Sequence, residues 1–220
     1  MVVRNASSRR AAVSIDIVMM ACREQHLCVL ADHLQTGKQR SLVLPWDLPA
    51  MGERLDAAAS RIAKRACGHA PTWIEQAGAF GDETAHPANA LVSICYVAVV
   101  PPPTREALWM NTQPMPTLPD RQRRMVSGAL EVVRTRLEQS PVAFSMLPRE
   151  FTLSELQQTY ETVLARRLHK ASFRRALQAA FLVEPTGEWR GEGRGRPAQL
   201  YRYAPRRRKG TRSGVRLDLL

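Results

Sequence analysis

The stretch GERLDAAASRIAKRACG, residues 52–68, decides the architecture of the first half of this chain. Apolar residues recur along it at the spacing of a helix, and basic residues fill the positions between them. The pattern predicts an amphipathic helix over residues 55–67, with one face buried and the other in water. The apolar positions are Leu55, Ala58, Ala59, Ile62, Ala63 and Ala66.

The positive charge is concentrated in the second half of the chain. The protein has 220 residues and a formal net charge of +12. Beyond residue 120 lie 21 of the 32 Lys and Arg residues but only 9 of the 20 Asp and Glu residues, so this half carries the whole excess. Such an asymmetry favours a polyanionic partner, nucleic acid before membrane, over a solvated basic face without function.

Cysteine and histidine spacing argues against metal binding and against a disulfide framework. The four cysteines (22, 28, 67 and 95) form no C-x-x-C pair, and the five histidines (26, 33, 69, 86 and 169) are scattered. We therefore expect reduced, mostly buried thiols and no metal. No apolar run approaches the roughly 20 residues that span a bilayer, and no signal peptide is evident, so we expect a cytoplasmic protein without a membrane segment.

Residues 1–115 show both strand and helix signals. Alternating, β-branched segments at 12–22, 26–32 and 90–100 predict strands, which together with the helix over 55–67 indicate an α+β domain. The proline-rich NTQPMPTLPD that follows is typical of a connection, so we place a domain boundary near residue 115. A length of 220 residues allows two domains that each bury a core.

The second half predicts helix, turn, helix and hairpin. A linker helix over 121–140 precedes TLSELQQTYETVL (152–164), where Thr152 and Glu155 have the spacing of a capping box. SFRRALQAAF (172–181) predicts the next helix after a break at 165–170. Strands at 181–185 and 198–205 then flank a Gly- and Arg-rich loop. This is the order of a winged helix-turn-helix domain, whose second helix enters the major groove of DNA.

The candidate DNA contacts are polar residues in that domain. Lys170, Ser172, Arg174 and Arg175 are expected at the major groove, Arg194 and Arg196 in the wing, and Thr152 and Ser154 at phosphates. The basic segment 206–220 is expected to be disordered and to add attraction that does not depend on sequence. Two alternatives remain, a dimerisation module and an RNA-binding domain, although single-strand binders use an exposed aromatic platform that is not evident here.

The opening stretch resembles the Nudix box, G-x5-E-x7-R-E-U-x-E-E-x-G-U, in which U is a bulky aliphatic residue. Glu53, Arg61 and Gly68 match its first E, its R and its late G. Four positions depart from it, because Asp47 replaces the first glycine, and Ile62, Arg65 and Ala66 replace glutamates. Since hard divalent cations need clustered oxygen ligands, we expect metal-assisted hydrolysis to be lost.

Further segments extend the resemblance over nearly the whole chain. IEQAGAFGD (74–82) resembles L-E-Q-x-x-T-F-G-D of one Nudix-derived group, and LVSICYVAVV (91–100) is similar to its next strand. LPREFTLSELQQTYETVL (147–164), SFRRALQAAFLVEPTG (172–187) and GRPAQLYRY (195–203) resemble its C-terminal domain. The group is the NrtR-type Nudix-related transcriptional regulators.

The resemblance implies an α+β chain, a Nudix-like α/β/α sandwich followed by a winged helix-turn-helix domain. The expected parts are a basic flexible N-terminus (1–11), an effector-sensing domain (12–115), a linker helix (116–140), the DNA-binding domain (141–205) and a basic tail (206–220). The implied function is a homodimeric repressor of NAD-metabolism genes that binds operator DNA and senses a nucleotide such as ADP-ribose without hydrolysing it. No cofactor is implied.

The candidate effector-binding residues are Glu53, Arg61, Phe80 and Asp82. Glu53 and Arg61 either contact the ligand or pair to hold the loop against the helix, and Phe80 either lines the pocket or belongs to the core. Two departures affect binding: Ser172 stands at the recognition helix where the group has asparagine, and LPWDLPAMGE lacks the glycines of L-P-G-G-F that let the backbone approach a diphosphate. The alternative function is a pyrophosphohydrolase of ADP-ribose or a related nucleotide with an accessory nucleic-acid-binding domain.

Overall fold

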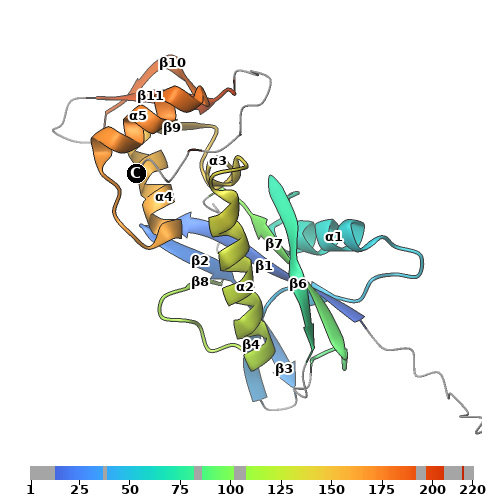
Figure 1. Cartoon of the computed structure of the whole chain (residues 1–220). Helices are drawn as coiled ribbons and strands as arrows, with labels where there is room; N and C mark the ends of the chain where they lie inside the picture. The colour runs from blue at the N-terminus through green and yellow to red at the C-terminus, as the bar shows by residue number, and fades with distance from the viewer. Residues whose placement is uncertain are drawn as a thin grey trace, which may run out of the picture.

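Figure 1 shows the computed structural model, in which a mixed sheet between two helices is joined to a smaller domain of helices and a hairpin. The structure describes residues 13–36, 39–81, 86–101, 108–191, 197–205 and 215. Arg194, Arg196, Asp82 and most of the expected basic tail lie outside the described residues.

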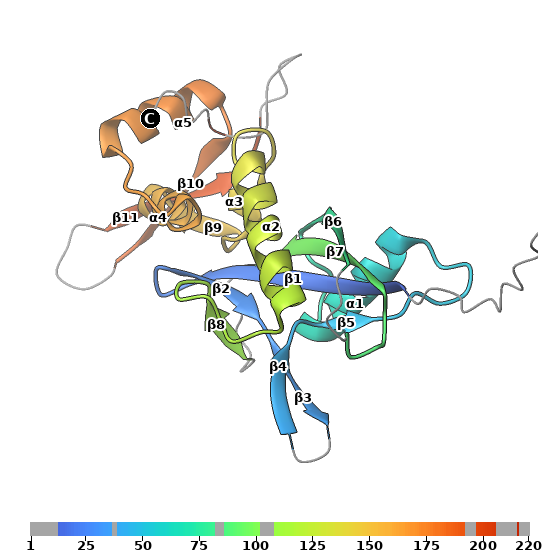
Figure 2. The ribbon, with the colours of Figure 1, turned by 60° about the horizontal axis from the view of Figure 1, so that its bottom comes forward.

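The large sheet has strand order β6-β7-β1-β2-β8, and β5 pairs with β1. Its central strand β1 (Val13–Arg23) is parallel to β7 (Val92–Val99) and antiparallel to β2 (His26–Leu30). The remaining strands are β5 (Trp46–Asp47), β6 (Trp73–Gly81) and β8 (Trp109–Asn111). A separate hairpin of β3 (Asp32–Thr36) and β4 (Gln39–Val43) projects from this sheet (Figure 2).

Helix α1 (Leu55–Cys67) has the bounds that the opening stretch predicts. It buries Ala58, Ala59, Ile62 and Ala63 against the outer face of β1, so the predicted apolar stripe is confirmed for these residues. Leu55 differs, since it is 40% exposed at the first position of the helix. Gly68 ends the helix in the left-handed conformation, at φ 86°, which glycine adopts without steric cost.

Helix α2 (Asp120–Arg136) crosses the opposite face of the sheet, as Figures 1 and 2 show. A close approach to β6 explains Gly128, because a β-carbon there would lie 3.2 Å from a ring carbon of Phe80. Arg136 closes the contact by forming an ion pair with Glu75 on β6. Helix α2 ends at Arg136, four residues before the predicted end at residue 140, and α3 (Val142–Ser145) follows as a single turn.

The second domain consists of β9 (Glu150–Thr152), α4 (Leu153–Leu164), α5 (Lys170–Ala180), β10 (Val183–Arg190) and β11 (Ala198–Tyr203), with sheet order β10-β11-β9. The predicted capping box of α4 is confirmed, since the side chains of Thr152 and Glu155 each accept a hydrogen bond from the other's backbone N–H.

Two predicted boundaries in this domain are wrong. Helix α5 begins at Lys170, two residues before the predicted start, so Lys170 lies inside the helix. Strand β10 continues to Arg190 rather than ending at Pro185, because a bulge between Pro185 and Trp189 lets the chain pass the proline and resume pairing. Gly187 lies within this bulge at φ 85°.

One core extends across both domains. The cluster on the α2 side of the large sheet continues through Leu137 and Phe144 into the second domain, where Tyr160 and Phe173 are fully buried. Val215 belongs to the same cluster and has no exposed surface. Residues 206–220 are expected to be disordered. This expectation is wrong at Val215, whose apolar side chain is buried in the core.

Candidate functional site

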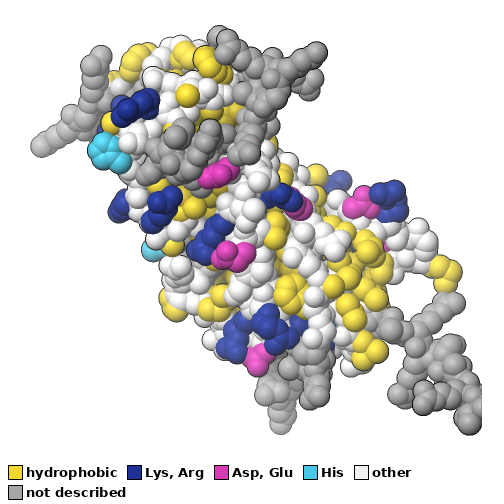
Figure 3. Space-filling model, in the orientation of Figure 1, with side chains coloured by type: hydrophobic (Ala, Val, Ile, Leu, Met, Phe, Trp, Pro, Cys, Tyr) yellow, Lys and Arg dark blue, Asp and Glu magenta, His cyan; other side chains and the backbone are white. Residues whose placement is uncertain are grey.

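Helix α5 presents a basic face on the surface of the second domain. Lys170, Arg174 and Arg175 are exposed, whereas Phe173 and Leu177 on the other side of the helix are buried against α4. The ring of Phe173 lies edge-on to Tyr160 of α4 with centroids 5.3 Å apart. The packing that fixes the orientation of α5 therefore leaves its cationic side chains directed to solvent. In Figure 3 basic side chains also lie beside the connection between α4 and α5.

The other candidate DNA contacts differ in accessibility. Ser172 is half-buried, and its hydroxyl lies 3.4 Å from Nδ1 of His169. The hydroxyl oxygen of Thr152 already accepts the capping hydrogen bond and the residue is only 9% exposed, whereas Ser154 is exposed. Trp189 on β10 was not identified from the sequence, yet it is 55% exposed beside the wing.

A cavity of about 460 Å³ lies beside α1, between the projecting hairpin and the sheet. This volume falls within the range of small-molecule sites. No sequence pattern assigns these residues to a pocket, because they come from four segments that only the fold brings together. The cavity is lined by Leu30, Ala31, Asp32, His33, Leu34, Val43, Leu44, Pro45, Trp46, Ile62, Arg65, Ala66 and Leu108.

An ion-pair cluster holds the loop before α1 against the helix. Arg61 donates to Glu53 (2.8 Å) and to Asp47 (2.9 Å), and Arg65 also donates to Asp47 (2.8 Å). A second bond from Arg65 reaches the carbonyl oxygen of Trp46 (3.1 Å), and the backbone N–H of Ala50 donates to Glu53. The pair of Glu53 and Arg61 thus has a structural partnership, beside the cavity that Arg65 lines.

These contacts determine the electrostatics of the loop. The hydrogen bond from Arg61 and that from the Ala50 amide lower the pKa of Glu53 to about 2. Partial burial raises the pKa of Asp47, but hydrogen bonds from Arg61, the Leu48 amide and Arg65 outweigh it, so the pKa of Asp47 is lowered. Hydrogen bonds to Glu53 and Asp47 raise the pKa of Arg61.

The residues present do not fit a hard divalent cation. The two carboxylates of the preceding loop, Asp47 and Glu53, are already bound by guanidinium groups, and a metal would have to displace these cations. Arg65 brings positive charge to a position where the Nudix frame has glutamate. Within the described ranges, no group of three or more His, Cys, Asp or Glu is placed to hold a metal ion.

Phe80 lies away from this cavity. It belongs to β6 and packs against α2, with its ring beside Gly128 on the face of the sheet opposite to α1. It is not among the residues that line the cavity.

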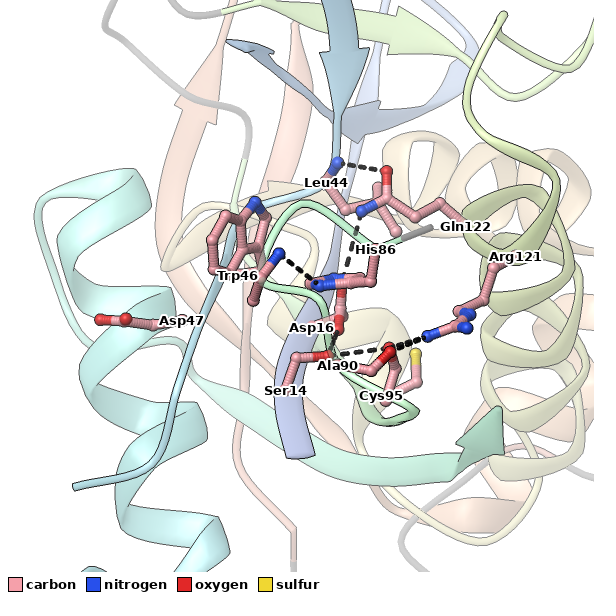
Figure 4. Close-up of polar contacts among 12 residues, drawn as sticks. Ser14, Asp16, Leu44, Trp46, Asp47, His86, Ala90, Cys95, Arg121 and Gln122 are labelled. Atoms are coloured by element: carbon pink, nitrogen blue, oxygen red, sulfur yellow. Dashed lines mark hydrogen bonds and ion pairs between the residues drawn. The ribbon is translucent and has the colours of Figure 1, made fainter. Parts of the chain in front are cut away.

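A buried polar cluster lies between the cavity and α2 (Figure 4). Asp16 on β1 is fully buried, and its carboxyl group contacts Nε2 of His86 (3.0 Å) and Nε2 of Gln122 (3.3 Å). The Ala88 amide donates to Nδ1 of His86, so the ring donates to Asp16 through Nε2. Ser14 donates to the other carboxyl oxygen (2.7 Å). A buried carboxyl group requires such donors, and no motif in the sequence marks them as neighbours.

The cysteines match the expectation of free thiols. All four are unpaired, with Cys28 and Cys95 buried and the other two half-buried. Burial raises the pKa of Cys22 to about 12. No helix in the described part of the chain is long and apolar enough to cross a membrane.

Comparisons with known proteins give the same two-domain picture. Residues 143–203 match the family model of the NrtR DNA-binding winged helix domain. The chain is 24% identical over 208 residues to the ADPR responsive transcriptional repressor NtrR of Acinetobacter baylyi, covering 87% of this chain and 82% of the relative.

Solved structures extend the likeness to the whole fold. The crystal structure of Shewanella oneidensis NrtR complexed with a 27mer DNA is 26% identical, with a TM-score of 0.75 over 88% of this chain and 94% of that one. A MutT/nudix family protein from Enterococcus faecalis is 18% identical, with a TM-score of 0.71 over 90% of this chain and 89% of that one. The predicted fold class, a Nudix-like sandwich followed by a winged helix domain, is confirmed.

Proposed function

We propose that this chain, which matches the NrtR winged helix domain over residues 143–203 and shares the fold of a solved NrtR over 88% of its length, is an NrtR-type transcriptional repressor that binds duplex operator DNA and responds to ADP-ribose. The observation that carries the proposal is the recognition helix α5, whose apolar side is locked against α4 while its basic side faces solvent. The S. oneidensis relative was crystallised on DNA, and the A. baylyi relative is named for its response to ADPR.

Major-groove binding follows from the side chains on α5. Arg174 and Arg175 are exposed one turn after the helix start, where recognition helices contact base edges, and Lys170 is close enough to the N-terminus to reach phosphate. Ser172 offers a hydroxyl where the family has asparagine, and a hydroxyl cannot make the bidentate contact with adenine that an asparagine amide makes. Arg194 and Arg196 are proposed to extend the wing to the DNA backbone or minor groove, and Thr152 and Ser154 to approach phosphates.

The cavity beside α1 is the proposed effector site. It combines an aromatic ring (Trp46), a cation (Arg65) and a carboxylate (Asp32), which suit an adenine ring, a diphosphate and ribose hydroxyl groups respectively. Glu53 and Arg61 support this site by fixing Asp47 and hence the loop that carries Trp46. Phe80 and Asp82 remain candidates from the resemblance alone.

We propose that the chain binds ADP-ribose without hydrolysing it and needs no cofactor. Its two loop carboxylates are neutralised by arginines, which leaves no oxygen cluster for Mg²⁺ near the helix. Release of AMP from ADP-ribose with Mg²⁺ or Mn²⁺, abolished in Glu53→Gln, would establish the hydrolase instead. From the family resemblance we also propose NAD-metabolism genes as targets and a homodimer as the DNA-binding form, and the dimer is expected because paired half-sites are read by two-fold symmetric proteins. The cytoplasmic location is proposed from the sequence.

The proposal is tested by fluorescence anisotropy with the duplex upstream of the protein's own gene, the duplex upstream of an NAD-synthesis gene, and a random duplex. We expect selective binding to at least one of the genomic duplexes at near-physiological salt, and a change in its affinity on addition of ADP-ribose. Equal affinity for all three duplexes would contradict the repressor, and selective binding indifferent to ADP-ribose would contradict the effector. Light scattering of the DNA complex then measures whether two chains bind each site.

A further inference from the structure

Residues 44–46, which lead from β4 into β5 and are called the β4–β5 segment, have one side on the proposed effector cavity and the other on the buried polar cluster. Leu44 and Trp46 both line the cavity. The backbone N–H of Leu44 donates to Oε1 of Gln122 (2.9 Å), and the indole of Trp46 meets the ring of His86 edge-on, with centroids 5.1 Å apart at 79°. Figure 4 shows Trp46 beside His86, while Asp47 points away toward α1. A ligand that moves this segment must therefore disturb Gln122 and His86.

Both of these contacts converge on a single atom. Nε2 of Gln122 and Nε2 of His86 contact the same oxygen, Oδ1 of Asp16, which is fully buried in the central strand. Gln122 uses its carbonyl oxygen and its amide nitrogen at once, and it is 1% exposed, so no water replaces either partner readily. A shift of Leu44 or Trp46 thus changes the hydrogen bonding at Asp16 and at the first turn of α2 together.

The first turn of α2 is tied to the sheet by a second group of this cluster. Arg121, 2% exposed, donates to the carbonyl oxygen of Ala90 (2.9 Å) and lies 3.4 Å from the hydroxyl of Ser93. The hydroxyl of Ser93 lies 2.8 Å from the hydroxyl of Ser14, which donates to Asp16. The start of α2 is therefore positioned by hydrogen bonds rather than by apolar packing alone, and these have specific directions that a small displacement breaks.

The far end of α2 bears on the DNA-binding domain. Arg134 donates to the carbonyl oxygen of Val163 (3.1 Å) near the end of α4, and the Tyr160 hydroxyl of α4 lies 3.4 Å from the carbonyl oxygen of Leu137. Tyr160 packs edge-on against Phe173 of α5. A helix of 17 residues is about 25 Å long and stiff, so a change at its first turn reaches these contacts as a rigid-body shift.

We propose that Asp16, His86 and Gln122 are positioning residues that transmit occupancy of the cavity to α2 and, through α2, to the recognition helix α5. This inference rests on the proposed function, because it takes ADP-ribose as the ligand and operator DNA as the target. It adds the route by which one site changes the other. A cavity of about 330 Å³ between the β1–β2 turn, α2 and α4 leaves space for α4 to move against the first domain.

The test uses the full-length Gln122→Met variant, in which a side chain of similar length removes both hydrogen bonds. Calorimetry measures its affinity for ADP-ribose, and anisotropy measures its affinity for operator DNA with and without saturating ADP-ribose. The wild type is expected to show a coupling of about 5- to 150-fold between the two ligands. In Gln122→Met we expect each separate affinity to stay near the wild-type value while the coupling falls to about 1, which means independent binding.

A matched control is Ser127→Ala, also on α2, whose exposed hydroxyl donates only to the Arg123 carbonyl oxygen. This variant should keep the wild-type coupling. His86→Phe is a second test, because it preserves a ring beside Trp46 but removes the hydrogen bond to Asp16, and it should also weaken the coupling. Wild-type coupling in both Gln122→Met and His86→Phe would overturn the inference and leave the proposed function intact.

Hydrogen exchange of the wild type covers the case in which the variants do not fold. ADP-ribose should alter exchange in residues 42–47 and 118–126, but not in the exposed half of α1. An operator complex that responds to ADP-ribose with no exchange difference in these two segments would overturn the inference. A wild type whose DNA binding ignores ADP-ribose would overturn both the inference and the proposed effector.

Discussion

At the scale of single residues, two departures from the Nudix frame carry opposite charges and pair with each other. Asp47 stands where the frame has glycine, and Arg65 stands where it has glutamate. Taken separately, each removes a feature of a hydrolase, but in the fold their side chains form a direct ion pair (2.8 Å). The cation at position 65 therefore has a carboxylate partner across the loop, and the pair holds the loop against α1.

The pKa of Glu53 leads to a prediction about stability and pH. Because its folded-state pKa is about 2 and its ordinary value is 4.5, the ionised carboxylate stabilises the fold above pH 4.5, and this contribution is lost as the pH falls toward 2. Glu53→Gln should therefore unfold at a lower temperature than the wild type at pH 6, with the difference shrinking between pH 4.5 and 2. Thermal unfolding followed by circular dichroism checks this, and a difference that stays constant with pH would contradict it.

Arg174 and Arg175 lead to a prediction about DNA specificity. If either contacts a base edge, its change to alanine should weaken operator binding by about 1–3 kcal/mol and relax the preference over random duplex. Arg54→Ala is the control, because Arg54 is a highly exposed arginine of the first domain and its loss removes the same charge. Anisotropy against both duplexes measures the effect. Equal losses on operator and random DNA would instead assign Arg174 and Arg175 to phosphates.

At the scale of elements, the second domain depends on the start of helix α4. Thr152 and Glu155 form the complete capping box, and Glu155 also accepts a hydrogen bond from Arg190 at the end of β10 (2.7 Å). One glutamate therefore joins the helix start to the wing strand. The sequence predicts the capping box because Thr152 and Glu155 are only three positions apart. It does not predict the contact of Glu155 with Arg190, which lies 35 positions later.

Removal of the cap leads to a prediction about stability. Thr152→Ala leaves the Glu155 amide without its acceptor at a buried position, which should cost about 1 kcal/mol and lower the unfolding midpoint by about 2–4 °C. Ser154→Ala, at an exposed position of the same turn, should leave the midpoint unchanged. Differential scanning calorimetry compares the two. A midpoint for Thr152→Ala equal to that of the wild type would show that the cap contributes nothing.

At the scale of the whole molecule, one hydrophobic core extends through both domains. Helix α2 packs along β6 and β7, its C-terminal part also contacts α4, and Val215 belongs to the same hydrophobic cluster. The predicted boundary near residue 115 stays a prediction, but the helix after it belongs as much to the sheet as to the connection. The two domains are therefore joined by packed structure along α2.

Val215 leads to a prediction about the C-terminal segment. Val215→Ala removes two buried methyl groups and should lower the free energy of unfolding by about 1–3 kcal/mol, through lost burial and the cavity left behind. Leu91→Ala is the control, since Leu91 is 64% exposed. Urea unfolding measures both. A Val215→Ala protein as stable as the wild type would mean that the segment carries only charge.

Local signals in the sequence determined much of this protein. The helical period of residues 55–67, the capping box at Thr152, and the helix-helix-hairpin order with its basic excess all depend on neighbours within a few positions. Family resemblance then supplied the order of the two domains. The burial of Phe173 and Leu177 on one face of α5 agrees with the helical period of that segment.

Only the tertiary structure decided which distant residues meet. Examples are the cavity lining, the bond between Asp47 and Arg65, the burial of Val215, and the cluster of Asp16, His86 and Gln122. The bond between Asp47 and Arg65 joins residues 18 positions apart, and the bond between Gln122 and Asp16 joins residues 106 positions apart. No local pattern encodes these contacts, because a buried polar side chain is tolerated wherever the fold supplies its partner. The sequence therefore determined the elements and their chemistry, whereas the packing of β1, residues 44–46 and α2 decided which side chains line the cavity and which meet at Asp16.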